Sequence, residues 1–364
     1  MEKTFPVSNG MEDYKKQIDE LLMLTAEKGG SDLHLSAGYY PTIRIDGRLI
    51  PLNDFSILNK NTTEGMAFGI MDEAHKQRFL SEKEIDFAYE LGDKIRSRVN
   101  IYLTRGNHSI VFRFIPPIIA TIEELNLPQS IKIFSKLSQG FVLVVGPNGH
   151  GKSTTMASII DLINHERAEK IITIEDPVEY IFTPDRSIID QREVNFDTFS
   201  FDKALRSTFR ENVNVIMVGE MRDYDTMSAA VSAAETGHLV FASLHTNNAA
   251  QTVERIVDTF PPSQQNQIIV QLANTISGII SQRLIPRIRG GLIPATEVMI
   301  ATTAVRNLIR EGKTQQLNLV IETGSDAGMI SMNRSLAELV RRREISSEQA
   351  EFYSLNPNEL KSLI

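Results

Sequence analysis

The 364-residue sequence contains no cysteine. Disulfides, zinc ribbons, iron–sulfur clusters and a cysteine nucleophile are therefore excluded. The sequence also has no excess of basic residues, because 38 Lys and Arg stand against 46 Asp and Glu and give a net charge of −8. This balance excludes a protein whose whole surface binds nucleic acid, although it leaves room for a local basic patch.

Long hydrophobic runs are absent as well. The most apolar stretches, residues 141–145 and 239–244, are far shorter than the ~20 residues that a membrane-spanning helix needs. The first 20 residues alternate charged and apolar side chains and show no signal-type hydrophobic core. We therefore expect a soluble protein that reaches a membrane only through a partner.

What is present is typical of a globular protein. Hydrophobic residues make up 41% and charged residues 23% of the chain, so a mostly disordered chain is excluded. The length is that of roughly two domains of about 100 to 200 residues each.

The first part of the sequence predicts a small α+β unit. Residues 14–28 carry apolar side chains at helical spacing, and Gly29 follows as a typical helix C-cap. Short alternating segments come next, at residues 32–35 and 42–50. The second contains Asp46-Gly47, a strong signal for a hairpin turn.

A second pair of strands and a boundary follow. Residues 98–103 and 109–114 are predicted to pair around Gly106-Asn107, and Pro116-Pro117 ends the run. Beyond it, Thr121 and Glu124 have capping-box spacing for a one-turn helix. We therefore predict an N-terminal domain at residues 1–115, a linker at 116–129 and a second domain at 130–364.

The second domain has the pattern of a parallel sheet covered by helices. Continuous apolar runs suit strands that are buried on both faces, and helical patterns follow three of the four runs. The runs are residues 141–145, 171–174, 215–218 and 239–244. Beyond Ala249 we expect mostly helix, including an amphipathic segment that contains Ile268, Leu272, Ile276, Ile279 and Ile280.

A phosphate-binding loop is predicted directly after the first run. Residues 146–153 read GPNGHGKS and fit the pattern G-x-x-x-x-G-K-[ST], followed by a helix-compatible segment. In such a loop backbone N–H groups cradle a di- or triphosphate, the Lys reaches the outer phosphates and the Ser hydroxyl holds Mg²⁺. The predicted nucleotide-binding residues are Gly146, Asn148, Gly149, His150, Gly151, Lys152, Ser153 and Thr154.

Further polar residues follow the other apolar runs. Glu175 comes after the second run, Glu220 after the third and His245 after the fourth. If the runs are parallel strands, their carboxyl ends face one crevice together with the phosphate loop, which is where open α/β sheets bind ligands. A single acid at a strand end is as well explained by a solvated loop.

His238 and His245 are seven residues apart, which raises the question of a shared metal. On a strand seven residues span about 23 Å, and an odd spacing puts the two side chains on opposite faces. A two-histidine metal site is therefore disfavoured. From the sequence alone His238 is as well explained by a structural hydrogen bond as by catalysis.

Taken together, these motifs resemble the secretion ATPase superfamily of type II secretion and type IV pili, and most closely its PilT-type retraction ATPases. The resemblance covers nearly the whole length. Beside the phosphate loop it is carried by SDLHLSAG at residues 31–38, TIEDPVEY at 173–180, VGEMRD at 218–223 and ETGHLVFASLHTN at 235–247.

The resemblance implies a fold and a set of roles. It implies a PAS-like N-terminal domain, a RecA-like ATPase domain with C-terminal helices, ATP and Mg²⁺ as ligands, and a ring of six chains. Lys152 and Ser153 would hold phosphates and Mg²⁺, and Glu220 would support the metal through water. Glu175 would orient or deprotonate the attacking water, and His245 would contact the γ-phosphate, with His238 as the second member of the His box.

The N-terminal domain also contributes candidates through the resemblance. The stretches SRVNIYLTRG and VFRFIPP match the family segment whose arginines close over the nucleotide, and these are Arg98, Arg105 and Arg113. Positive side chains from outside the phosphate loop suit the charge that spreads over a transferring phosphoryl group. Without the resemblance, each of the three is best explained as a surface charge.

The block AVRNLIREGK at residues 304–313 resembles a motif of retraction members. Its apolar residues recur at helical spacing, so Arg306, Asn307, Arg310 and Glu311 are expected to face outward and to contact a partner. An ordinary amphipathic helix with a solvated face explains the same pattern.

Two departures from the family pattern are Val305 in place of Ile, and His150, where the family usually has Ser. We expect ATP binding to survive the second, because the loop works through backbone amides. Assembly and type II secretion members typically carry an extra N-terminal domain and a four-cysteine zinc site. The absence of cysteine therefore favours retraction.

The sequence thus predicts a cytoplasmic, Mg²⁺-dependent, hexameric ATPase that retracts type IV pili and powers twitching motility. It would act on an inner-membrane platform protein, with a paralogous ATPase as a further partner and without nucleic acid. The alternatives are a sister secretion motor of type IVB or type II kind, or a retraction accessory motor. A RecA-like nucleic-acid motor and a nucleotide-binding module that does not hydrolyse remain as rivals from other classes.

Overall fold

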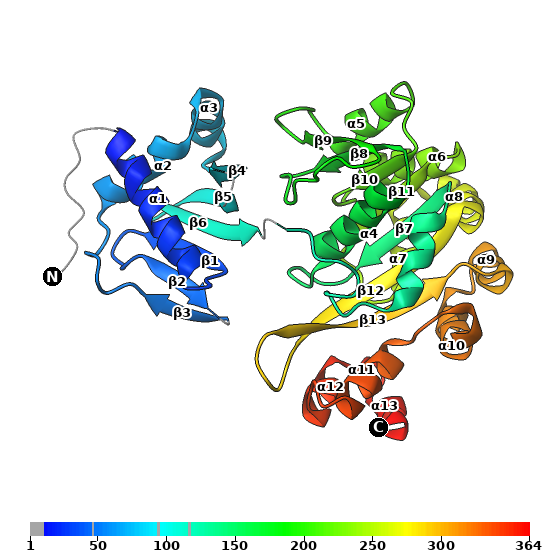
Figure 1. Ribbon diagram of the computed structural model, residues 1–364. Coiled ribbons are helices and arrows are strands. Elements are labelled where there is room, and N and C mark those ends of the chain that lie inside the picture. Colours follow the sequence, from blue (N-terminus) through cyan, green and yellow to red (C-terminus); the bar gives the residue numbers. More distant parts are fainter. Residues whose placement is uncertain (1–10, 46, 93–94, 116–117) are drawn as a thin grey trace. The chain divides into compact units, whose positions relative to one another are not determined.

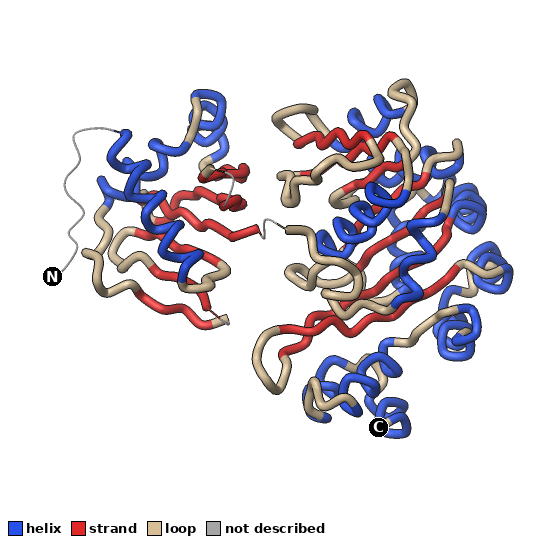
Figure 2. The backbone as a smooth tube through the Cα atoms, in the orientation of Figure 1, coloured by secondary structure: helices blue, strands red, loops and turns tan. Residues whose placement is uncertain are grey.

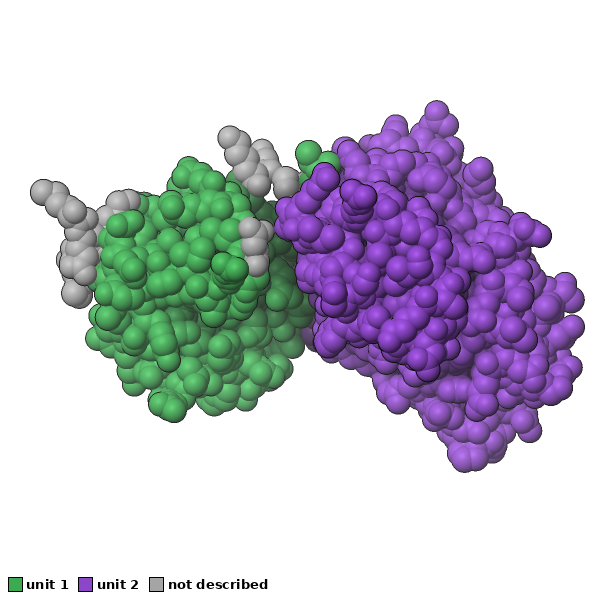
Figure 3. All heavy atoms as spheres, turned by 90° about the horizontal axis from the view of Figure 1, so that it is seen from below, with its two compact units in different colours: residues 1–118, 179–181 green, residues 119–178, 182–364 purple. Residues whose placement is uncertain are grey.

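The computed structural model describes residues 11–45, 47–92, 95–115 and 118–364. They form two compact units, one of residues up to 118 together with 179–181, the other of residues 119–178 and 182–364. Figure 3 colours the two units separately. Among the described residues, no helix has both the length and the apolar content needed to cross a bilayer.

The first unit is an antiparallel sheet packed against helices. Its strand order is β3-β2-β1-β6-β5-β4, and α1 and α2 pack on it through a core that includes Ile18, Leu22, Leu33 and Phe112 (Figure 1). Its elements are α1 (Met11–Glu27), β1 (Asp32–Ser36), β2 (Thr42–Ile45), β3 (Arg48–Pro51), α2 (Lys60–Ile70), α3 (Glu73–Glu82), β4 (Glu84–Leu91), β5 (Ile95–Thr104) and β6 (Asn107–Ile115).

Most of the elements predicted for this unit are present. α1 ends next to Gly29, whose φ of 67° provides the left-handed C-terminal turn. β2 pairs with β3 and β5 with β6, both antiparallel. Of the residues named for turns and boundaries, Asp46, Pro116 and Pro117 lie outside the described part of the chain. The prediction did not include β4, α2 and α3.

The second unit is built on a mixed sheet with helices on both faces (Figures 1 and 2). The strand order is β13-β12-β7-β11-β10-β8-β9. Its strands are β7 (Gly140–Val145), β8 (Lys170–Glu175), β9 (Ile188–Glu193), β10 (Val215–Val218), β11 (Leu239–Leu244), β12 (Ile276–Pro286) and β13 (Leu292–Ile300).

The helices of this unit connect the strands and continue beyond them. They are η1 (a 3-10 helix, Gln129–Lys136), α4 (Lys152–Glu166), α5 (Phe201–Thr208), α6 (Tyr224–Glu235), α7 (Ala249–Thr259), α8 (Pro262–Thr275), α9 (Thr303–Arg310), η2 (Thr314–Gln316), α10 (Leu317–Thr323), η3 (Ser325–Ala327), α11 (Met332–Arg341), α12 (Ser347–Tyr353) and α13 (Pro357–Leu363). Before them, Thr121 and Glu124 make the two predicted capping-box hydrogen bonds, although the segment forms only a turn.

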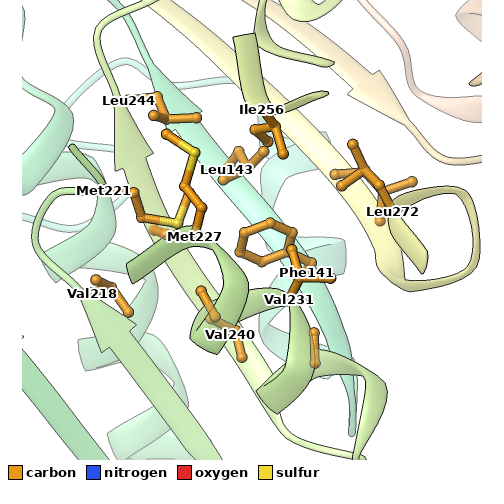
Figure 4. Close-up of a cluster of buried hydrophobic side chains, with 14 of the residues drawn as sticks. Phe141, Leu143, Val218, Met221, Met227, Val231, Val240, Leu244, Ile256 and Leu272 are labelled. Atoms are coloured by element: carbon orange, nitrogen blue, oxygen red, sulfur yellow. The ribbon is translucent and has the colours of Figure 1, made fainter. Parts of the chain in front are cut away.

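The four predicted apolar runs are the central strands of the sheet. β7 pairs with β11, β11 with β10 and β10 with β8, all parallel. Every residue of β7, β10 and β11 is buried, as expected for strands that have helices on both faces. Phe141, Leu143, Val240 and Leu244 pack with helices α6, α7 and α8, as Figure 4 shows. The predicted fold class and the parallel direction of these strands are confirmed.

One prediction for this region is wrong. Ile276, Ile279 and Ile280 do not continue helix α8 but lie in β12, which runs parallel to β7 and pairs with β13 as an antiparallel hairpin. A short run of buried β-branched residues suits a helix and a strand equally by periodicity. Gly278 in this strand leaves room for the Phe134 ring, because a Cβ there would lie 2.2 Å from the ring.

Candidate functional site

The phosphate-binding loop joins β7 to α4, as predicted. It starts after Val145 and ends at Gly151, which is the N-cap of α4. Gly149 and Gly151 have φ values of 75° and 80°, a left-handed conformation that glycine adopts without steric cost. The loop therefore leads into the N-terminal end of a helix, where free N–H groups and the helix dipole favour phosphate.

Lys152 is the first residue of α4 and is only 8% exposed. Its Nζ donates to the carbonyl oxygens of Gly146 and Pro147 at 2.9 and 3.0 Å. The same Nζ lies 3.1 Å from Nδ1 of His245. The ammonium group is thus held inside the curve of the loop, at the edge of the sheet where the strands end.

His245 connects this lysine to the acid after β10. Because the lysine ammonium can only donate, Nδ1 of His245 accepts and Nε2 carries the ring proton. Nε2 lies 2.9 Å from Oε1 of Glu220, and Oε2 of Glu220 accepts from Arg222 at 2.8 Å. Lys152, His245, Glu220 and Arg222 form one continuous chain of contacts across the ends of three strands.

Glu220 is charged at neutral pH in this setting. Burial alone raises the pKa of its carboxyl group. The hydrogen bond from Arg222 and the positive charges of Arg222 and Lys152 outweigh burial and bring the pKa below its ordinary value. An ionised carboxylate at this position suits a group that supports a bound cation.

Glu175 ends β8 at the same edge and is 5% exposed. Oε1 accepts a hydrogen bond of 2.7 Å from Thr173 Oγ1. A Cβ at Gly219 would lie 3.4 Å from Cα and 3.7 Å from Cγ of Glu175. Glu175 therefore lies against Gly219, in the turn that carries Glu220.

Two residues that the sequence-based prediction missed hold this edge together. Thr173 orients Glu175, and Ser243 Oγ donates to the carbonyl oxygen of Gly219 at 2.6 Å. Each lies two residues before a predicted site residue, Glu175 or His245, on the same face of its strand. A polar residue at that spacing in an otherwise apolar strand is the signal that could have found them.

The remaining loop residues lie where expected. Asn148 and Gly149 are exposed at the bend of the loop, His150 is partly buried, and Ser153 and Thr154 follow Lys152 in the first turn of α4. The structure thus brings the predicted loop, Glu175, Glu220 and His245 to one edge.

His238 is not brought to this edge. It precedes β11, whereas His245 follows that strand, so the two lie at opposite ends of it. Nδ1 of His238 lies 2.9 Å from the carbonyl oxygen of Ala233, and its ring packs against Phe209. The position of His238 in this chain supports the structural interpretation and not the catalytic assignment.

The three predicted arginines fall into two places within the first unit. Arg98 and Arg113 lie directly opposite each other on β5 and β6, and pair with Asp86 and Asp32. Arg105 is in the turn at the end of the same hairpin, with a φ of 51°. Arg105 is seven residues from Arg98, which is about 23 Å at the rise of a strand, so the three do not form one cluster.

Helix α9 carries the predicted partner-contact residues, and one of them does not face outward. Val305 and Ile309 are buried, as expected. Arg306, however, donates from Nη1 to the carbonyl oxygens of Ala273 and Asn274 at 2.9 and 2.6 Å. It thus caps the C-terminal end of α8, where a cation satisfies free carbonyl groups. The outward-facing assignment of Arg306 is wrong, whereas Asn307, Arg310 and Glu311 are exposed.

A buried carboxyl group, that of Glu297 on β13, contacts the first residue of α7, the helix that follows the loop after His245. It accepts hydrogen bonds from the Ala249 N–H at 2.9 Å and from Ser281 Oγ at 3.0 Å. Burial raises the pKa of Glu297, whereas these two hydrogen bonds and the charge of Arg283 act against the rise. Glu297 therefore fixes the start of α7, and burial makes the ionised form of its carboxyl group unfavourable.

The raised pKa of Glu297 predicts that the effect of Glu297→Gln on stability depends on pH. Because the pKa is raised in the folded state, the contribution of Glu297 to stability is fully present below its unfolded pKa and is lost as the pH rises through the folded pKa. The variant keeps both acceptor bonds but cannot ionise. Its free energy of unfolding relative to the parent should therefore increase from pH 4.5 to pH 8 in urea titrations. A difference that is constant across this range would contradict the prediction.

A mixed sheet whose central strands are parallel, with a phosphate loop, two acids and an imidazole at the carboxyl ends of those strands, defines a P-loop ATPase domain. Comparison with known sequences then identifies the family. Residues 13–351 match the family described as type II/IV secretion system protein, and the chain belongs to this family.

Similar proteins and a similar solved structure support this family assignment. The chain is 43% identical over 333 residues to the type IV pilus retraction ATPase PilT of Pseudomonas aeruginosa, covering 92% of this chain and 96% of that protein. It is 42% identical to a twitching motility protein of Neisseria gonorrhoeae, over 85% of this chain and 83% of that protein. The crystal structure of the pilus retraction motor PilT with bound ADP matches with a TM-score of 0.86 at 43% identity, covering 95% of this chain and 99% of that chain.

Proposed function

We propose that this chain is an ATP-hydrolysing motor that retracts type IV pili and thereby powers twitching motility. The observation that carries the proposal is the contact chain from Lys152 through His245 to Glu220, next to Glu175, in a protein 43% identical to PilT over most of both lengths. ATP is the substrate, and the phosphate loop at residues 146–153 binds its phosphates.

The residues at this edge have separate roles in ATP hydrolysis. Lys152 exchanges its carbonyl partners for oxygens of the outer phosphates and offsets their charge. Glu175, held by Thr173, orients and deprotonates the attacking water. His245 lies between Lys152 and Glu220 and is placed to contact the γ-phosphate. A change at the γ-phosphate therefore reaches the loop after β11 through His245.

The residues also fit a magnesium ion. Mg²⁺ prefers oxygen ligands and usually keeps several waters and substrate phosphates in its shell. The Ser153 hydroxyl and the ionised Glu220 carboxylate are oxygen donors at the same edge. Among the described residues no group of three or more His, Asp or Glu forms a complete protein cage for a metal, which fits an ion shared with the nucleotide. Bound there, Mg²⁺ would offset negative charge on the phosphates.

The arginines of the first unit give a prediction of their own. Among the Ala variants of Arg98, Arg105 and Arg113, those that remove a charge acting on the transferring phosphoryl group should lower kcat about tenfold or more while the Kd for ADP changes less than threefold. Phosphate-release kinetics and ADP titration measure the two effects. Arg78→Ala, in a surface ion pair of α3, is the matched control. Parent-like turnover in all three variants would reject the role of these arginines.

The working assembly that we propose is a ring of six chains beneath an inner-membrane platform protein, with a paralogous ATPase as a further partner. It is cytoplasmic and attaches to the membrane through the platform. The exposed Asn307, Arg310 and Glu311 of α9 are the proposed partner contacts.

The pilus function is tested by deleting the gene in its own organism. We expect surface pili to remain while retraction events and twitching are lost, because extension does not need this motor. The parent gene should restore both, and a gene carrying Glu175→Gln should not. Normal retraction in the deletion strain would reject the proposal and favour the sister secretion motor.

A further inference from the structure

The phosphate loop has a second neighbour besides the acids, namely strand β12. β12 lies on the far side of β7 from β11, and its Ser281 pairs with Val145, the last residue of β7. Residues 282–284 therefore extend past the end of β7 alongside the loop. The family motifs used above do not include this segment.

Gln282 bonds the loop to the helix that follows it. Its side chain is buried, with 3% of the residue exposed. Oε1 accepts a hydrogen bond of 2.7 Å from Thr155 Oγ1, and Nε2 donates to the carbonyl oxygen of His150 at 2.9 Å. One amide group thus satisfies a donor in the first turn of α4 and an acceptor in the loop.

His150 makes a second contact with the same strand. The backbone N–H of Leu284 donates to Nδ1 of His150 at 2.9 Å. The ring must therefore be neutral, with its proton on Nε2. Burial, together with the charges of Arg283 and Lys152, lowers the pKa of His150 and favours this form. The side chain in which the loop departs from the family pattern is thus used as an anchor.

Two glycines of the loop, Gly146 and Gly151, lie against Gln282. A Cβ at Gly146 would lie 2.3 Å from the carbonyl oxygen of Gln282, and one at Gly151 would lie 2.8 Å from Nε2 of Gln282. The first distance is to a backbone atom and leaves no room for a side chain at Gly146, whereas the second would force the Gln282 amide to move. At Gly146 the backbone of the loop therefore lies directly against the backbone of β12.

We propose that Gln282 is a positioning residue for nucleotide binding, which with His150 fixes the phosphate loop on β12 before ATP arrives. The Gln282 side chain touches the loop and α4, and it acts through them. A loop that is already in its binding shape loses less conformational freedom when the phosphates bind, so the affinity is higher. This inference rests on the proposed ATPase function and names a residue that sets its nucleotide affinity.

The test is the variant Gln282→Met, which keeps the length of the side chain and removes both hydrogen bonds. We expect the Kd for ADP and the KM for ATP to rise about tenfold, as for a lost buried hydrogen bond, while kcat changes less than threefold. Amide hydrogen exchange of residues 147–151 should become faster. Thr155→Val removes one partner and should weaken ADP binding as well, and the two changes together should be less than additive.

Thr296→Val is the matched control. Thr296 lies directly opposite Gln282 in the β12–β13 register and is 1% exposed, so its loss tests general damage to the hairpin. We expect parent-like Kd and loop exchange. The proposal is overturned if Gln282→Met binds ADP like the parent, or if Thr296→Val weakens binding equally. If Gln282→Met does not fold, parent-like binding by Thr155→Val overturns it.

Failure of the proposed function would look different. ADP binding and hydrogen exchange are measured without turnover and without pili. A parent protein that binds ADP but releases no phosphate would reject the ATPase, whereas the contrast between Gln282→Met and Thr296→Val would still decide the role of Gln282.

Discussion

Glu175→Gln should reduce the steady-state rate of phosphate release about 1000-fold, because it removes the general base while the side chain keeps its shape. Glu175 is buried at the end of β8 and is held by Thr173. Glutamine can still accept this hydrogen bond, so the fold and the phosphate loop should be intact. The Kd for ATP, from equilibrium titration, should therefore stay within about threefold of the parent.

The control for this variant is Glu193→Gln. Glu193 lies opposite Glu175 in the register of the neighbouring edge strand β9, and Oε2 accepts from the Val178 N–H, an acceptor role that glutamine can also fill. We expect its turnover to stay within about threefold of the parent. Undiminished hydrolysis by Glu175→Gln would reject Glu175 as the base.

Lys152→Gln should weaken ATP binding and reduce turnover together, each by about 100-fold or more. Lys152 is buried within the loop, and its ammonium contacts two loop carbonyls and Nδ1 of His245. Its loss removes positive charge from the phosphate site and leaves Nδ1 of His245 without this donor. Titration with ATP and phosphate release measure the two effects.

Lys170→Gln provides the comparison for the lysine. Lys170 starts β8, at the opposite end of that strand from Glu175, and pairs with Asp190 on the surface. It should bind and hydrolyse ATP like the parent, because surface ion pairs contribute little. If Lys152→Gln kept parent-like affinity at an unchanged melting temperature, the loop would not be the nucleotide site.

The central sheet was predictable because its signals are local and repeated. Each central strand is a continuous apolar run, and its carboxyl end leads into the phosphate loop or to a polar residue. Parallel direction then places Lys152, Glu175, Glu220 and His245 at one edge without any knowledge of the strand order. The strand order itself, with β11 and β10 between β7 and β8, depends on helix packing that the runs do not encode.

The predictions failed where tertiary contacts decide between equal local patterns. Residues 276–280 have no periodic feature that separates a buried strand from a helix, and pairing with β7 and β13 decides for the strand. Arg306 has the exposed position of an amphipathic helix, but the C-terminal end of α8 lies within reach of its guanidinium group. Gln282 was missed for the same reason, because its partners are 127 and 132 residues away.

A crystal structure with a non-hydrolysable ATP analogue and Mg²⁺ would show whether the nucleotide binds at this edge of the sheet. We expect outer phosphates against the backbone amides of residues 146–153, the ammonium of Lys152 on phosphate oxygens, and a water between the γ-phosphate and the Glu175 carboxylate. A nucleotide bound away from the carboxyl ends of β7, β10 and β11, or a γ-phosphate out of reach of Glu175 through one water, would contradict this expectation.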